Sequence, residues 1–228
     1  MIVNPAPWES LAPLQSIPRL RHGFLTRVPG VDVDTPDKAK ALETLKPHHK
    51  AAMEELGMDG WPFVSAEQIH GSGIAVLSKS ASDLPSHTEL NGMDGFVTDR
   101  RGLALGIYVA DCAAVYLVDP VRTVAGLVHS GRKGTELGIT QRAISLMASE
   151  FGSQPSELIA VVSPCIRPPA YEVDFAAAIR EQCRNSGIPP ESIHDARVCT
   201  SSDLSRFYSY RTEKGKTGRM LAVLGWEP

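Results

Sequence analysis

The sequence predicts an α+β fold, a layered α/β sandwich in which mixed β-sheets are flanked by helices. Short runs of β-branched and aliphatic residues, bounded by Gly, Asp, Asn and Pro, fill the stretch between residues 63 and 131. After residue 134, stretches of helical periodicity alternate with further strand-like runs. No internal repeat, low-complexity tract or long linker divides the 228 residues, so we predict a single domain over residues 1–228.

The first predicted helix covers residues 36–57. Its sequence is typical of a helix except at Pro47, which we expect to break it, and Gly57 marks its end. Five strands are predicted to follow, at residues 63–71, 74–79, 95–99, 103–119 and 123–131. Most of the sheet structure should therefore lie in this part of the chain.

The second half of the chain supplies the remaining helices. A helix is predicted at residues 135–152, with Thr135 as its N-cap and Gly152 at its end. A strand at 158–164, an amphipathic helix at 173–187 and a last strand at 218–226 complete the pattern. This mixture of strands and helices predicts layers rather than a bundle or an all-β sandwich.

Composition excludes several classes of protein. A hydrophobic share of 43% is ordinary for a globular protein, and a net charge of -3 gives no basic field for nucleic acid. No apolar stretch reaches membrane-spanning length, and the N-terminus lacks the pattern of a secretion signal. The four cysteines contain no CxxC pair, so reduced thiols are expected. We therefore expect a cytoplasmic protein with a small-molecule substrate and no nucleic-acid or membrane partner.

Three candidate metal ligands lie near the ends of predicted strands, namely His70, Cys112 and His129. Two imidazoles and one thiolate suit Zn²⁺ and leave a fourth tetrahedral position open for water or substrate. Their spacing matches no local zinc signature, so the residues alone leave other roles open. A buried Cys is often a small hydrophobe, and a His at a strand end is often a hydrogen-bonded polar residue.

Short motifs along nearly the whole chain help to decide whether these three residues bind a metal. They are residues 22–27 (HGFLTR), 68–71 (QIHG), 94–98 (DGFVT), 110–112 (ADC), 125–129 (AGLVH), 164–166 (PCI), 171–173 (YEV), 207–211 (FYSYR) and 217–220 (TGRM). In content and order they resemble the laccase-domain, or polyphenol-oxidase-like, family. Its members are described as zinc-dependent purine nucleoside phosphorylases and, in one branch, as a peptidoglycan editing factor.

The resemblance implies that His70, Cys112 and His129 bind the metal and take part in catalysis, with zinc favoured over copper. It also implies a fold like the catalytic domain of cytotoxic necrotizing factor. The expected reaction is phosphorolysis of adenosine, inosine or methylthioadenosine, adenosine deamination, or both. Asp111 is a further catalytic candidate that would orient a ligand or a water, although it could instead cap a strand or bind backbone amides.

Five residues are candidates for binding the substrate. Arg132 and Lys133 precede a predicted helix and would hold phosphate with backbone N–H groups, although a solvated turn is the alternative. Arg27, Gln68 and Tyr171 lie in motifs that match the family. Relatives typically carry Trp and Arg where this chain has Arg132 and Lys133, so substrate preference and turnover are open.

Three rival functions remain at this stage. A cysteine-type hydrolase or amidase acting on a peptidoglycan precursor would use Cys112 as its nucleophile and His129 as its base. A copper-dependent polyphenol oxidase would need a further imidazole cluster, which seven scattered histidines hardly supply. The third is a zinc-binding module without catalysis. The sequence leaves the physiological substrate, the metal in the cell and the oligomeric state open.

Overall fold

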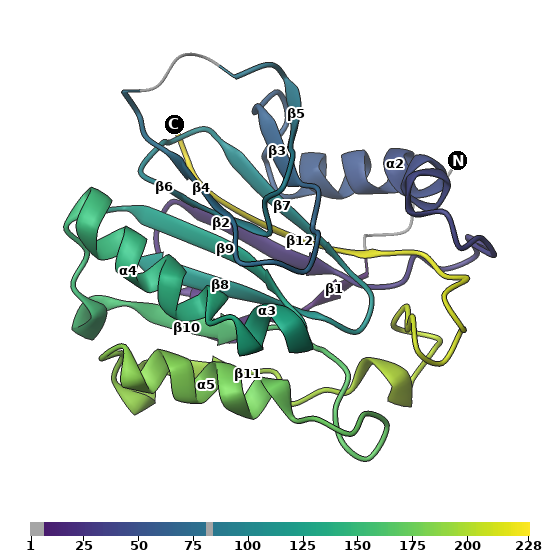
Figure 1. Cartoon of the computed structure of the whole chain (residues 1–228). Coiled ribbons are helices and arrows are strands. Elements are labelled where there is room, and N and C mark those ends of the chain that lie inside the picture. Colours follow the sequence, from purple (N-terminus) through teal and green to yellow (C-terminus); the bar gives the residue numbers. More distant parts are fainter. Residues whose placement is uncertain (1–6, 81–83) are drawn as a thin grey trace.

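The computed structural model describes residues 7–80 and 84–228. Within them, two six-stranded mixed sheets stack face to face (Figure 1). The first sheet has the strand order β1 (Trp8–Glu9), β2 (Leu20–Leu25), β12 (Met220–Trp226), β7 (Ala104–Val109), β3 (Phe63–Ala66) and β5 (His87–Leu90). The second has the order β11 (Ile193–Asp195), β10 (Ile159–Val162), β8 (Ala113–Asp119), β9 (Val124–Ser130), β6 (Gly95–Thr98) and β4 (Ile74–Leu77).

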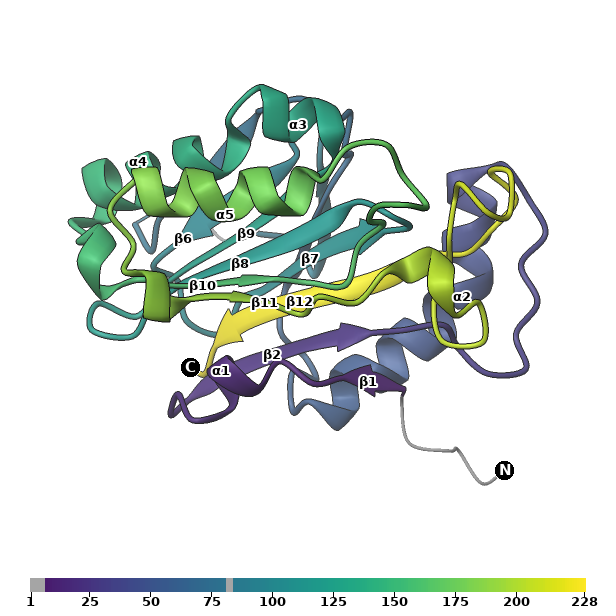
Figure 2. The same ribbon diagram turned by 90° about the horizontal axis from the view of Figure 1, so that it is seen from below.

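Helices cover the outer faces of both sheets. The long helix α2 (Lys38–Glu55) packs on the first sheet, whereas α4 (Ile139–Phe151) and α5 (Phe175–Asn185) lie side by side on the second (Figure 2). Two short helices complete the set, α1 (Ala12–Gln15) and α3 (Arg132–Glu136). This arrangement confirms the predicted α+β sandwich with mixed sheets flanked by helices. No helix in the described part of the chain is long and apolar enough to cross a bilayer.

Strand β8 shows why this part of the sequence is so apolar. Its side chains alternate between two cores: Ala114, Tyr116 and Val118 face the first sheet, whereas Val115 and Leu117 face α4 and α5. Both faces of a central strand are buried in a four-layer sandwich, so a continuous hydrophobic run is required instead of simple alternation.

The prediction of one strand over residues 103–119 is wrong. The chain leaves the first sheet after Val109, turns through 110–112 and enters the second sheet at Ala113. The turn requires a left-handed backbone at Asp111, whose φ is 81°. Apolar content does not distinguish one long strand from two strands in different sheets, because both are buried on two faces.

Two helix predictions also need correction. Helix α2 runs through Pro47 without the expected break, because it buries Ala41, Leu45 and Ala52 against the first sheet and this packing offsets the lost hydrogen bond. The helix predicted at 135–152 is divided at Gly138, which has a φ of 70°. Thr135 is therefore not an N-cap but lies inside α3. Gly152 does end α4, as predicted, with a left-handed backbone.

The topology brings three loops to one edge of the sandwich. Strands β3, β5 and β7 are parallel in the first sheet, so their carboxyl ends lie at the same end. From there the chain crosses each time into the second sheet, to β4, β6 and β8 respectively. Strand β9 is antiparallel to β6 and β8 and ends where they begin. Residues in these loops and at the end of β9 are therefore neighbours in space.

Candidate functional site

The three predicted metal ligands meet at this edge. His70 lies in the loop after β3, Cys112 lies in the loop after β7, and His129 lies near the end of β9. One ligand atom from each side chain lies within 4.8 Å of the other two. A tetrahedral zinc ion with bonds of about 2.0–2.3 Å would place its ligand atoms roughly 3.3–3.7 Å apart, so only a small inward shift is needed. The donor set and its spacing therefore fit a divalent metal ion.

The three ligands also leave room for a fourth. His129 is buried, Cys112 is partly buried, His70 is exposed, and all three line one cavity. A metal held by three protein ligands at the wall of a cavity keeps one coordination position for water or substrate, which is the arrangement of a catalytic rather than a structural zinc site.

The backbone around the site is strained. Gln68, His70 and Asp111 have φ values of 63°, 61° and 81°, a region that residues with a Cβ rarely adopt. Each such residue costs about 1–3 kcal/mol unless the surrounding structure fixes it. His70 is itself a candidate ligand, Gln68 lies close to it in the sequence, and Asp111 directly precedes Cys112. Strain at these positions indicates that the fold maintains the geometry of the site against local backbone preference.

Asp94 organises the site, although the sequence analysis did not single it out as a site residue. Its buried carboxylate accepts hydrogen bonds from the His70 N–H at 2.9 Å and from the Gly71 N–H at 2.8 Å. Its Oδ1 also lies 2.9 Å from Nδ1 of His129. A carboxylate at Nδ1 leaves Nε2 of His129 free to bind a metal and fixes the ring orientation. Its place in the DGFVT motif, directly before a strand, was the available signal.

The charges of Cys112 and His129 are coupled. Burial alone would raise the pKa of the Cys112 thiol, but the positive charge of His129 and hydrogen bonds with His129 and His70 lower it to about 6. Burial alone would lower the pKa of His129, but Cys112 and Asp94 raise it to about 9. The metal-free site therefore favours a thiolate at neutral pH, and a thiolate is the form that binds metal.

Gly131 allows the close approach of Cys112. A Cβ added at residue 131 would lie 2.4 Å from the Cys112 Sγ atom, a distance that real contacts do not show. We expect Gly131→Ala to displace the thiolate, to weaken metal binding and to lower the free energy of unfolding by about 1–3 kcal/mol through overpacking. Metal content after dialysis and thermal melts of the metal-stripped protein would measure the two effects.

Gly134→Ala is the matched control for this substitution. Residue 134 lies in helix α3, for which Gly131 is the N-cap, and the nearest atom to an added Cβ, the carbonyl oxygen of Gly71, is 3.3 Å away. If the Gly131→Ala and Gly134→Ala variants retain the same amount of metal, close packing against the Cys112 thiol is not required for metal binding.

Asp111 connects the turn that carries Cys112 to the C-terminal part of the chain through hydrogen bonds. Its carboxylate accepts hydrogen bonds from the Thr200 hydroxyl at 2.7 Å, from the Ser209 hydroxyl at 3.1 Å and from the Arg211 N–H at 2.7 Å. These contacts match the alternative in which Asp111 binds nearby polar groups of the chain. Asp111 also lines the cavity, and its catalytic role stays a prediction.

The cavity beside the ligands has a volume of about 960 Å³ and a strongly basic lining. Six of its lining residues are Lys or Arg, whereas two are acidic, although the whole chain has a net charge of -3. Two of these cations, Arg132 and Lys133, are candidates predicted from the sequence, whereas the other four are not: Lys38, Arg211, Lys214 and Arg219. Such a lining attracts anionic ligands.

Four of the five predicted substrate-binding residues line this cavity, namely Gln68, Arg132, Lys133 and Tyr171. The amide of Gln68 is already engaged, because it donates to the Tyr108 carbonyl at 2.5 Å and accepts from the Tyr108 N–H at 3.0 Å. Arg132 forms ion pairs with Glu136 and Glu172. The substrate contacts of these residues stay predictions.

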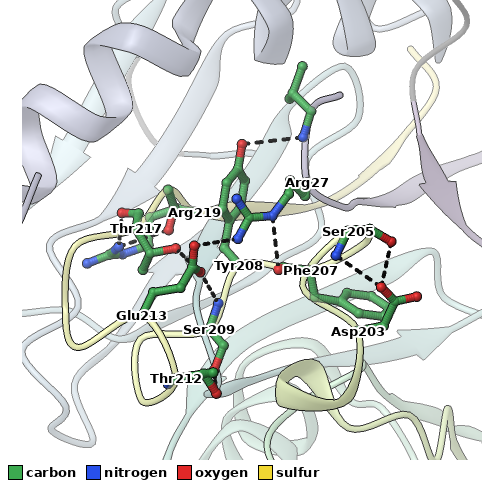
Figure 3. A network of polar contacts seen from close by, with 12 residues as sticks. Arg27, Asp203, Ser205, Phe207, Tyr208, Ser209, Thr212, Glu213, Thr217 and Arg219 are labelled. Carbon is green, nitrogen blue, oxygen red and sulfur yellow. Dashed lines mark hydrogen bonds and ion pairs between the residues drawn. The ribbon is translucent and has the colours of Figure 1, made fainter. Parts of the chain in front are cut away.

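The structure does not bring Arg27 to the cavity lining. Its guanidinium pairs with Glu213 at 2.6 Å, donates to the Phe207 carbonyl at 3.2 Å and stacks on Tyr208 (Figure 3). Arg27 therefore braces the C-terminal loop from which Arg211, Lys214 and Arg219 reach the cavity. Its partners Phe207, Tyr208 and Glu213 lie far away in the sequence, so the motif alone gave no sign of this role.

Fold and site together define a class of protein: two stacked mixed sheets with a His₂Cys site open to a basic cavity. The chain belongs to the family described as multi-copper polyphenol oxidoreductase laccase, whose model matches residues 30–175 and 172–227. The family predicted from the sequence is confirmed. The likeness to cytotoxic necrotizing factor stays a prediction.

Individual relatives cover most of the chain. It is 31% identical over 198 residues to the purine nucleoside phosphorylase YlmD of Geobacillus stearothermophilus, with 72% of each protein covered. It is 29% identical over 209 residues to YlmD of Bacillus subtilis, covering 77% of this chain and 74% of that protein. The solved structure of the hypothetical protein YfiH of Bacillus licheniformis matches with a TM-score of 0.82 at 26% identity, covering 97% of this chain and 99% of that one.

Proposed function

We propose that this protein is a zinc-dependent enzyme that acts on purine nucleosides, by phosphorolysis of adenosine, inosine or methylthioadenosine. Adenosine deamination is a second reaction that the same cavity suits. The observation that carries the proposal is the placement of His70, Cys112 and His129 on the wall of a basic cavity of about 960 Å³. The names of the relatives as purine nucleoside phosphorylases support the substrate class.

The number of candidate ligand groups favours zinc over a multicopper centre. The family description names several coppers, but the described residues contain one group of three or more candidate ligands, and a multicopper oxidase needs a further imidazole-rich cluster. When bound, zinc would supply Lewis-acid polarisation of a substrate or water oxygen. Polyphenol oxidation with copper and metal binding without turnover are the outcomes that would contradict the proposal.

The side chains of the protein have separate tasks in phosphorolysis. A phosphate oxygen attacks C1′ of the nucleoside, the C1′–N9 bond breaks, and the purine leaves with a proton while ribose 1-phosphate forms. The basic residues of the cavity would hold the phosphate, and the ring of Tyr171 offers a flat surface for the purine. Asp94 keeps His129 in the orientation that binds metal. Reaction rate then depends on how closely these groups hold the two reactants together.

The direct test is an assay of purified protein on adenosine, inosine and methylthioadenosine, with and without phosphate, after metal analysis. We expect free base to appear only when phosphate is present, to stop after chelation and to return with added zinc. Inosine formed from adenosine without phosphate would identify deamination. Metal-loaded protein without turnover on these substrates would leave a binding module, and phenol oxidation with copper would identify an oxidase.

A cysteine-type hydrolase or amidase, for example on a peptidoglycan precursor, is the second candidate function. It is favoured by the chain of contacts from Asp94 to His129 and by the lowered pKa of Cys112, which together form a nucleophile, a base and an orienting carboxylate. The predicted likeness to cytotoxic necrotizing factor points the same way. Activity that survives chelation but is lost on alkylation of Cys112 would support this function over the metal-dependent one.

A further inference from the structure

The six cations that line the cavity differ in how their charge is balanced. Arg132 pairs with Glu136 and Glu172, and Arg211 lies 3.6 Å from Glu172. The guanidinium of Arg219 has no carboxylate within 4.0 Å among residues 7–80 and 84–228. A partly buried guanidinium without an acidic partner is costly and therefore indicates a ligand-binding role.

Arg219 is held in place by neutral groups. Its Nη1 donates to the carbonyl oxygens of Thr217 and Gly218, both at 2.9 Å, whereas Nε and Nη2 make no hydrogen bond to the described residues. Burial lowers the pKa of Arg219, and Tyr210, Cys112 and Asp111 partly offset this. Arg219 lines the same cavity as Cys112 and Asp111.

The neighbouring acid, Glu213, is directed elsewhere. One of its oxygens pairs with Arg27 at 2.6 Å, and the other accepts from the Ser209 N–H at 2.9 Å and from the Thr217 hydroxyl at 2.5 Å (Figure 3). Both oxygens of Glu213 are therefore engaged by Arg27 and by neutral groups, and Glu213 forms no ion pair with Arg219.

Lys38 supplies a second cation from the opposite end of the chain. It begins helix α2, lines the same cavity and donates to the carbonyl oxygen of Glu67 at 2.7 Å. Burial lowers its pKa most, Glu89 opposes this, and the positive charge of Arg219 lowers it further. Within the described part of the chain, Lys38 and Arg219 are hydrogen-bonded only to neutral carbonyl groups, and the Arg219 guanidinium also lies over the Tyr210 ring. Two cations of the same cavity without a carboxylate partner among these residues would be stabilised by a bound anion.

We propose that Lys38 and Arg219 form the phosphate-binding subsite of this cavity, beside the metal ligands. A phosphate dianion offers several acceptor oxygens, which matches the free donors of Arg219 and the point charge of Lys38. The exposed Lys214, which lines the same cavity and has no ion-pair partner among the described residues, adds a third positive charge. This proposal rests on the proposed function, because it takes the bound phosphate to be the co-substrate of phosphorolysis. A phosphate group carried by a nucleotide substrate has the same chemistry and is the other source that the test distinguishes.

The test is calorimetric titration of the metal-loaded protein with inorganic phosphate and, separately, with adenosine 5′-monophosphate. We expect Lys38→Gln and Arg219→Gln each to weaken phosphate binding at least about tenfold, the effect of losing a hydrogen bond to a charged group. Arg219→Lys should recover part of the loss because the charge is kept. Binding of the nucleotide but not of inorganic phosphate, with the same dependence on both residues, would assign the subsite to the phosphate of the substrate.

Matched controls distinguish a loss of phosphate binding at this subsite from the effect of removing any positive charge. Lys40→Gln changes an exposed lysine on the same helix, and Arg142→Gln changes an exposed arginine on α4. Both should bind phosphate as the unaltered protein does, and all variants should keep their zinc content. Lys38→Gln keeps the test meaningful if the Arg219 variants fail to fold. Phosphate binding that is equal in the Lys38→Gln variant and the unaltered protein would overturn the proposal, as would absence of phosphate and nucleotide binding.

The two proposals fail in different ways. If phosphate binds through Lys38 and Arg219 but no nucleoside is cleaved, the subsite stands and the proposed function falls. If nucleosides are cleaved and KM for phosphate is unchanged in both variants, the proposed function stands and the subsite falls.

Discussion

Replacing His129 with Ala should abolish metal retention and, with it, any release of free base or inosine from nucleosides. His129 is one of three candidate protein ligands, and it is the buried one whose ring is oriented by Asp94. Loss of a residue that only orients a metal ligand typically lowers affinity about 10–100-fold, and loss of the ligand itself should exceed this. Metal analysis of the dialysed variant and the nucleoside assay with added zinc would measure both effects.

His48→Ala is the matched control. His48 is an exposed histidine on α2 and is not one of the grouped ligands. This variant should keep the metal content and the activity of the unaltered protein. Full activity of His129→Ala after exhaustive removal of metal would contradict the metal-dependent mechanism, and equal metal content in the two variants would contradict the ligand assignment.

Replacing Asp94 with Asn should damage both stability and metal affinity. The carboxylate accepts from the backbone of His70 and Gly71 and from the His129 ring, so an amide NH₂ at this place must face one of these donors. Each buried donor left without an acceptor costs about 1–3 kcal/mol. Metal affinity should fall about 10–100-fold, because the His129 ring loses the charge and the acceptor that orient it. Denaturant unfolding of the metal-stripped protein and competition with a chelating dye would measure these changes separately.

The pH dependence of this effect has a defined sign. Burial alone would raise the pKa of Asp94, but the hydrogen bond and charge of His129 and the N–H groups of Gly71 and His70 lower it. The stabilisation by the ionised carboxylate is therefore complete above its usual pKa near 4 and is lost as the pH falls through the lower folded value. The stability difference between the two proteins should shrink in acid. It should also shrink as the pH rises from the usual histidine pKa near 6.5 towards about 9, because Asp94 contributes to the raised pKa of His129.

Asp99→Asn provides the comparison. Asp99 follows the same strand β6 at its other end, where it accepts from the Lys79 N–H at 2.7 Å and pairs with the Lys79 ammonium. We expect a small loss of stability and no loss of metal affinity. If Asp94→Asn binds zinc as tightly as Asp99→Asn does, Asp94 does not orient the metal site.

Part of this site was predictable from residue types and local pattern. Two imidazoles and a thiol that follow or interrupt hydrophobic strands indicated a metal site, and the motifs indicated the family, which the comparison confirms. Gly152 as a helix end was also predictable, because a left-handed helix end favours glycine through backbone sterics alone.

Other features depended on partners that are distant in the sequence. Asp94 received no role in advance because its three donors come from the loop after β3 and from strand β9. Arg27 was predicted to bind substrate, but its partner Glu213 lies at the other end of the chain. A charged residue in a motif gives the same sequence signal whether it meets a ligand or another side chain.

The sequence by itself determined the ligand types, the alternation of strands and helices and the family, because these depend on side-chain chemistry and on periodicities within a few residues. Only the tertiary structure decided that Asp111 marks a crossing between two sheets, that Asp94 contacts two of the candidate ligands and that Lys38 and Arg219 share one cavity. The physical reason is that the parallel arrangement of β3, β5 and β7 places their carboxyl ends together. Strand pairing between distant segments sets these distances, and no local pattern of residues contains them.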